Sequence, residues 1–60
     1  MKLWIARDKD GYLFLFDEKP NRYEFWFDSK LGDSYNLKDD FFPEVTFENS
    51  PKKVEIKLVK

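Results

Sequence analysis

The chain has 60 residues, with eleven basic and twelve acidic side chains, no cysteine and no histidine, and its net charge is −1. This composition predicts a single small domain over residues 1–60 without disulfides, and it argues against a zinc site and against the basic surface of a nucleic-acid binder. Seven phenylalanines, three tyrosines and two tryptophans remain to build the core, because each aromatic side chain buries roughly 150–250 Å².

The first half of the chain predicts a meander of three antiparallel strands. Residues 2–7 are rich in strand-forming side chains, and the sequence at 8–11 is typical of a three-residue hairpin loop that ends in glycine. Residues 12–16 are wholly apolar. After a second loop over residues 17–22, residues 23–28 alternate clearly and form the expected third strand.

The second half predicts one helical turn and a hairpin. Residues 34–37 favour a short strand, but Asn36 also suits the cap of a helical turn over residues 38–42. Residues 45–48 and 54–58 both alternate, on either side of a turn. The expected fold is therefore mostly β: a three-stranded antiparallel meander, one short helical turn near residues 38–42, and a C-terminal hairpin.

The loop lengths fix an expected register, because directly opposed residues lie on the same side of a sheet. The expected pairs are Trp4 with Phe16, Ala6 with Phe14, Phe16 with Tyr23, and Phe14 with Phe25. One face of the sheet is then mainly aromatic and the other mainly aliphatic. The segment 12–16 is apolar on both sides and belongs in the middle of a sheet that is covered on both faces.

The rest of the chain covers one face well and the second only marginally. We therefore expect a residual apolar patch, either exposed or covered by a second copy of the chain, because such patches mark interaction sites. The expected interaction patch consists of Leu3, Ile5, Leu13, Leu15 and Trp26.

No pattern of residues predicts catalysis or metal binding. When residues 8–11 are aligned with a calcium loop, Ala6 falls on the first ligand position and Asp17, not glutamate, on the twelfth. The adjacent carboxylates at 17–18 and 39–40 are typical of solvated turns, and the serines have no histidine to activate them. We expect a protein that is not an enzyme, with no catalytic residue, cofactor or metal.

Single-stranded nucleic acid is the alternative ligand, because aromatic residues interleaved with basic ones can form a stacking platform. The candidates are Lys2, Trp4, Arg7, Phe14, Phe16, Arg22, Tyr23 and Phe25. Acidic residues interspersed among them repel phosphate, so packing in the core is the favoured interpretation of these aromatic residues, and nucleic acid is a disfavoured partner.

Two stretches of the chain carry a resemblance: KLWIARDKDGYLFLF with EKP (residues 2–16 and 18–20), and FPEVTFE with VEI (residues 42–48 and 54–56). Together they resemble a group of short, uncharacterised proteins encoded by gut Bacteroides-type bacteria and their phages or mobile elements. The resemblance implies a small protein of bacterial or phage origin, and it implies no activity and no site residues.

The leading hypothesis is a non-enzymatic protein-interaction module or a small homo-oligomeric accessory protein, with another protein or a second copy as its partner. The chain has no apolar run long enough for a membrane span and no signal-peptide core near residue 1, so we expect a cytoplasmic location and no membrane partner.

Overall fold

The computed structural model describes residues 2–55. Its strands are β1 (Lys2–Arg7), β2 (Leu13–Phe16), β3 (Asn21–Arg22), β4 (Phe27–Asp28), β5 (Ser34–Leu37) and β6 (Lys52–Glu55). The described residues contain no helix, and the predicted mostly-β fold class is confirmed.

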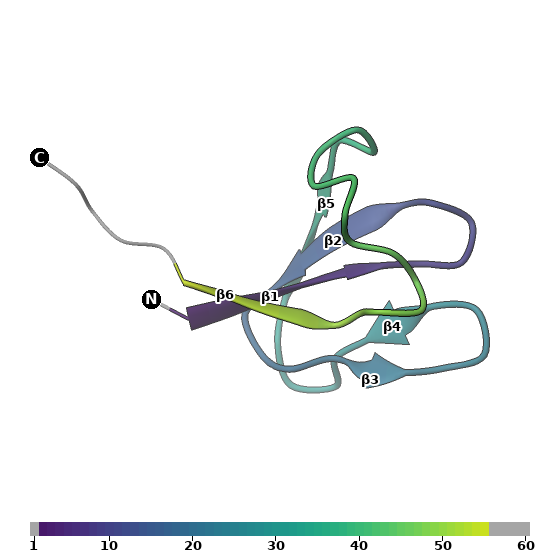
Figure 1. The fold of residues 1–60 in the computed structure, drawn as a ribbon. Coiled ribbons are helices and arrows are strands. Elements are labelled where there is room, and N and C mark those ends of the chain that lie inside the picture. The colour runs from purple at the N-terminus through teal and green to yellow at the C-terminus, as the bar shows by residue number, and fades with distance from the viewer. Residues whose placement is uncertain (1, 56–60) are drawn as a thin grey trace, which may run out of the picture.

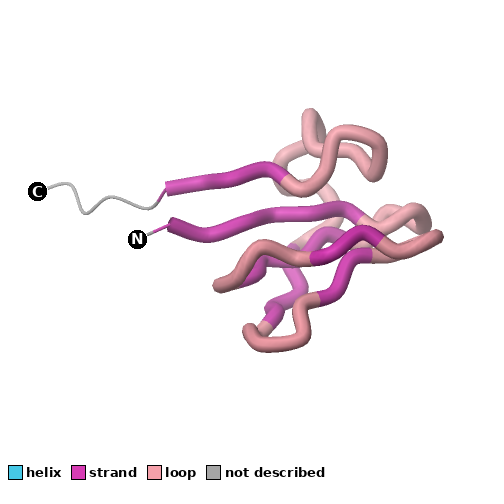
Figure 2. The backbone as a smooth tube through the Cα atoms, turned by 90° about the horizontal axis from the view of Figure 1, so that it is seen from below, coloured by secondary structure: helices cyan, strands magenta, loops and turns pink. Residues whose placement is uncertain are grey.

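Four strands form one antiparallel sheet in the order β5-β2-β1-β6, and β3 and β4 form a second, two-stranded sheet. In Figure 1 the β3–β4 hairpin lies below this sheet, while the connection from β5 to β6 rises above it before descending to β6. Figure 2 shows that β1 and β6 run side by side and that long loops link the short strands.

The hairpin of β1 and β2 has the predicted register, in which Trp4 pairs with Phe16 and Ala6 with Phe14. Its loop is also as predicted. The Gly11 N–H donates to the Asp8 carbonyl at 3.0 Å, and the Asp8 N–H donates to the Tyr12 carbonyl at 2.8 Å. Gly11 has a φ of +100°, which glycine adopts because it has no Cβ. Local turn chemistry is therefore sufficient to align these two strands.

The third strand of the meander is β5, and the prediction that residues 23–28 take this place is wrong. β2 pairs with β5, so the expected pairs of Phe16 with Tyr23 and of Phe14 with Phe25 are not formed. The short strand predicted over residues 34–37 is confirmed with the same bounds.

Residues 23–26 form the turn of the β3–β4 hairpin, closed by a hydrogen bond of 2.8 Å from the Tyr23 N–H to the Trp26 carbonyl. These residues form a separate hairpin, and not a third strand of the sheet, because the sheet needs a second layer. A sheet that is apolar on both sides must be covered on both sides, and the hairpin supplies Phe27, which is buried against Ala6 and Phe16. The same residues in a third strand would leave that face open.

β6 pairs with β1 rather than with residues 45–48. Thr46 and Asn49 close a turn, because the Thr46 N–H donates to Asn49 Oδ1 at 2.8 Å and the Asn49 N–H donates to Thr46 Oγ1 at 3.2 Å. These side chains satisfy backbone groups that a strand would otherwise pair. Residues 56–58 of the predicted last strand lie outside the described residues.

The helical turn predicted near residues 38–42 is a single hydrogen-bonded turn, in which the Phe41 N–H donates to the Lys38 carbonyl at 3.1 Å. Phe42 follows with a φ of +50°, in the left-handed region that ends a right-handed helix. The Val45 N–H donates to the Phe42 carbonyl at 2.9 Å and closes a second turn. The connection from β5 to β6 is thus a pair of linked turns.

The four-stranded sheet has an aliphatic face (Leu3, Ile5, Leu13, Leu15, Leu37 and Val54) and an aromatic face (Trp4, Ala6, Phe14 and Phe16). Val45 covers the aliphatic face at Ile5 and Leu13. Phe27 and Phe47 cover the aromatic face at Ala6 and Phe16. The central strand β2 is consequently covered on both sides at its ends, with Leu13 and Phe16 at 0% and 1% exposure, while Phe14 and Leu15 are half-buried.

Candidate functional site: an apolar groove on the aliphatic face

The five residues of the predicted interaction patch do not form one exposed surface. Leu3, Ile5 and Leu13 are buried, and Leu15 is half-buried. Trp26 is exposed, but it lies in the turn of the β3–β4 hairpin, which covers the aromatic face. The predicted exposure is wrong at these three residues. The connection from β5 to β6 folds across the aliphatic face and places Val45 over Ile5 and Leu13, while Leu3 is 8% exposed beside Val54 of β6.

Beside Val45 the aliphatic face remains open as a groove of about 660 Å³. Each strand of the sheet contributes one apolar side chain, and the connection from β5 to β6 contributes the rest. The lining residues are Ile5, Leu15, Leu37, Asp40, Phe41, Phe42 and Val54. Two of them, Ile5 and Leu15, belong to the predicted patch. Pockets of roughly 300–1,000 Å³ with a mainly apolar lining are typical binding sites.

Arg7 holds the connection that forms one side of the groove. This half-buried side chain donates from Nε to the Val45 carbonyl at 2.6 Å, and from Nη2 to the carbonyls of Phe41 and Phe42 at 2.9 and 3.2 Å. Its Nη1 donates to the carbonyls of Gly11 and Asp39 at 2.7 and 3.0 Å. A planar guanidinium with several fixed donors suits this role, whereas lysine presents a single ammonium. The connection is therefore fixed to the sheet by one side chain.

Phe41 and Phe42 are the exposed aromatic residues of the groove, at 47% and 45% exposure. Their rings meet edge to face, with centroids 6.4 Å apart and an interplanar angle of 86°. Phe42 also has a φ of +50°, a conformation of low population for a bulky residue, and such strain clusters at binding sites. Two aromatic side chains are thus held beside an apolar groove at a cost in backbone energy.

The sequence contained a signal for these two residues. Phe41 and Phe42 stand between two aspartates and a proline, in a loop where bulky apolar residues are unusual. Their apolar character is compatible with covering a sheet face, and periodicity does not distinguish a covering residue from an exposed one. The folded connection shows that Val45 is buried against the sheet, while Phe41 and Phe42 remain half exposed.

A second aromatic surface lies on the turn of the β3–β4 hairpin. Tyr23 and Trp26 stack with ring centroids 5.5 Å apart, and Lys9 Nζ lies 5.2 Å from the centroid of the half-exposed Phe25 ring. This surface accounts for the exposure of Trp26. Tyr23 and Trp26 cover one another, and neither they nor Phe25 line the groove.

The residues of the alternative nucleic-acid platform are mostly engaged in the fold. Phe16 is buried beneath the hairpin, and Arg7 is bound to five carbonyl groups. Trp4 is half-buried with Lys19 and Lys53 over its ring, their Nζ atoms 5.5 and 5.8 Å from the centroid. The aromatic face is therefore part of the core and presents no row of open rings.

Arg22 also serves the fold. Its guanidinium carbon lies 5.0 Å from the centroid of the Phe27 ring and 4.4 Å from that of Phe47. Its Nη2 donates to the carbonyls of Phe47, Glu48 and Ser50 at 2.5, 3.2 and 3.2 Å. Arg22 thus ties the β3–β4 hairpin to the segment that leads into β6.

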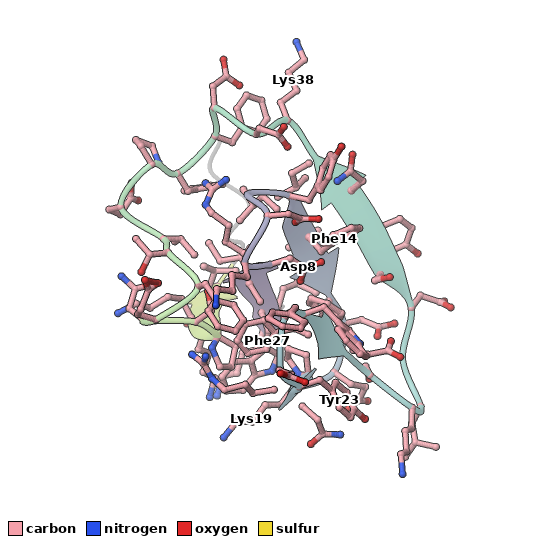
Figure 3. All side chains as sticks on the ribbon, turned by 90° about the vertical axis from the view of Figure 1, so that its right-hand side faces the viewer. Asp8, Phe14, Lys19, Tyr23, Phe27 and Lys38 are labelled. Atoms are coloured by element: carbon pink, nitrogen blue, oxygen red, sulfur yellow. The ribbon has the colours of Figure 1, made fainter. Side chains whose placement is uncertain are left out.

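Asp8 joins the other end of the same hairpin to the sheet. Its Oδ1 accepts a hydrogen bond of 3.0 Å from the Phe27 N–H, and Figure 3 shows Asp8 directly above Phe27. Burial raises the pKa of Asp8 above its ordinary value of 3.8, the hydrogen bond from Phe27 opposes this rise, and the charge of Asp10 adds to it. The carboxylate therefore serves as a structural acceptor at the edge of the core.

Residues 2–55 contain no cluster of three or more acidic side chains placed to hold a metal ion. No helix long and apolar enough to cross a membrane occurs in this same part of the chain. No protein-family model, curated protein sequence or solved structure matches the chain.

Proposed function

We propose that the protein is a non-enzymatic protein-interaction module whose groove receives apolar side chains of a second polypeptide. The observation that carries the proposal is the state of Phe41 and Phe42, which are half exposed beside the groove while Arg7 holds their carbonyl groups. Aromatic anchors dominate binding energy in many interfaces. An anchor that is fixed before binding loses less conformational entropy on binding.

The chemistry of the groove supports recognition rather than catalysis. Six of its seven lining residues are apolar, and Asp40 is the seventh. No second titratable side chain lines the groove beside Asp40 in the described residues, so the groove itself does not supply the acid and the base of a catalytic pair. The proposal includes the bacterial or phage origin that the resemblance implies and the cytoplasmic location that the sequence predicts.

We do not extend the proposal to single-stranded nucleic acid. A stacking platform requires several open aromatic faces along a basic track. Phe16 is buried, Phe27 and Phe47 enclose Arg22, and Trp4 keeps two lysines over its ring. These contacts favour core packing for the aromatic face.

Affinity capture from the native host tests the proposal. The tagged wild-type chain is compared with Phe42→Asn, because asparagine tolerates a positive φ and removes the aromatic anchor. We expect proteins retained by the wild type, an untagged copy of the chain included, to be lost with Phe42→Asn. Mass spectrometry of the retained fraction gives the result.

Leu31→Asn is the matched control. Leu31 is 95% exposed in the loop between β4 and β5, and it lines a separate cavity with Lys19 and Asn21. This variant should retain every protein that the wild type retains. Recovery of the same set of proteins with Phe42→Asn would contradict the proposal, because the groove would then contribute nothing to recognition.

A further inference from the structure

We infer that the second polypeptide in the groove is a second copy of this chain, in a two-fold symmetric dimer; this inference rests on the proposed function. In such a dimer one surface meets itself, so that surface must carry both a projection and its receptacle. The groove satisfies this condition. Phe41 and Phe42 offer half-exposed rings along the groove, and Leu15, Val54 and Leu37 of the sheet form its apolar floor.

The charges on this surface are also self-complementary. The segment 39–44 on the β5 side of the groove carries Asp39, Asp40 and Glu44, all exposed, and no basic residue. Arg7 beneath this segment donates to carbonyl groups, and no hydrogen bond joins it to a carboxylate among the described residues. The rim on the β5 side therefore has a net negative charge.

The β6 side of the same surface is basic. Lys52 pairs with Ile5 in the register, so its side chain lies on the aliphatic face, and it is exposed. A two-fold rotation that places Phe41 and Phe42 of one copy on the β6 side of the other floor brings Asp40 toward Lys52 of the partner subunit. The same rotation brings Lys52 of the first copy toward Asp40 of the partner subunit. Apolar fit and charge thus select one arrangement.

The size of the chain supports the same conclusion. A domain of this length rarely gains more than roughly 3–5 kcal/mol from its own core, and oligomerisation is a common reinforcement. Among residues 2–55, seven large apolar or aromatic side chains are at least 45% exposed, and two of these, Phe41 and Phe42, line the groove. Covering Phe41 and Phe42 with a second copy removes apolar surface from water on both chains at once.

Sedimentation equilibrium of the full chain from about 1 μM to about 1 mM measures the association directly. We expect the wild type and Leu31→Asn to reach the mass of a dimer, and Phe42→Asn to remain a monomer at concentrations where the wild type is a dimer. A wild-type mass of one chain at every concentration would overturn the inference, and so would a Phe42→Asn dimer of unchanged affinity.

Charge reversal tests the orientation. Asp40→Lys and Lys52→Glu each place two like-charged contacts in the dimer and should weaken self-association about tenfold. An equimolar mixture of the two variants should form a heterodimer of about wild-type affinity, because both contacts are then restored with opposite charges. Failure of the mixture to associate better than either variant alone would overturn the two-fold arrangement.

These measurements separate the inference from the proposed function. A monomeric wild type that captures other proteins through Phe42 overturns the dimer and leaves the interaction module intact. A wild type that neither associates nor captures any protein in a Phe42-dependent way overturns both.

Discussion

Arg7 shows how one residue of this chain determines the shape of the groove. Its five carbonyl acceptors come from the loop after β1 and from the connection between β5 and β6. In the sequence, Arg7 is the last residue of a predicted strand and one candidate of the alternative nucleic-acid platform. Its role depends on carbonyl groups more than thirty residues away, and periodicity carries no information about such contacts.

Arg7→Met should destabilise the domain by about 2–4 kcal/mol, because hydrogen bonds to a charged group contribute about 1.5–3 kcal/mol and several carbonyls lose their donor at once. This loss is comparable with the whole stability of a small core. Urea denaturation followed by tryptophan fluorescence measures it. Lys38→Met, which removes a cation that projects away from the body in Figure 3, should stay within about 0.5 kcal/mol of the wild type. Equal midpoints for the two variants would refute the role of Arg7.

Asp8 gives the domain a specific pH dependence. Its folded-state pKa is raised mainly by burial, so the folded state holds the proton more tightly than the unfolded state. Stability from this residue is therefore present below pH 3.8 and declines as the pH rises through the folded-state pKa. Asp8→Asn keeps an oxygen acceptor for the Phe27 N–H without the charge. The stability of Asp8→Asn relative to the wild type should rise with pH across this interval, measured by thermal unfolding in a pH series. A stability difference between Asp8→Asn and the wild type that does not change with pH would contradict the raised pKa of Asp8.

At the scale of elements, the sequence is informative where the determinants are local. Asp8 and Gly11 set the loop, the loop sets the register of β1 and β2, and the register sorts their side chains correctly into two faces. The partner of β2 was predicted wrongly because residues 23–28 and 34–37 both have strand character. The choice between them is made by the second layer: Phe27 and Phe47 are needed above the aromatic face.

The β3–β4 hairpin should behave as a unit that Arg22 attaches to the rest of the domain. Arg22→Gln removes the stacking against Phe27 and Phe47 and the donors to three carbonyls. Amide exchange of Phe27 and of Tyr23 should accelerate roughly tenfold, while the amides of the β1–β2 ladder keep their protection. Hydrogen-exchange NMR resolves the two groups. Lys30→Gln, an exposed change in the next loop, is the control. Uniform acceleration across the sheet would show that the hairpin does not open separately.

At the scale of the whole molecule, the sequence predicted an excess of apolar surface but not its position. The description of strand 12–16 as apolar on both sides was correct, and it required two covers. Which residues stay open depends on how far the connection from β5 to β6 reaches across the sheet. That reach is set by Arg7 and by two linked turns, so it is a property of the folded chain and not of any local pattern.

The distribution of burial predicts opposite outcomes for two apolar residues of the same molecule. Leu13 is 0% exposed at the centre of the sheet. Leu13→Glu places a charge in the core without a partner. This variant should not fold, because the free energy lost exceeds the roughly 3–5 kcal/mol that such a core supplies. Phe42 is 45% exposed at the rim, and Phe42→Asn should leave the urea midpoint within the range of surface variants. Circular dichroism and urea denaturation compare them. A folded Leu13→Glu would return this residue to the exposed interaction patch, whereas an unfolded Phe42→Asn would make Phe42 part of the core and remove it from the binding site.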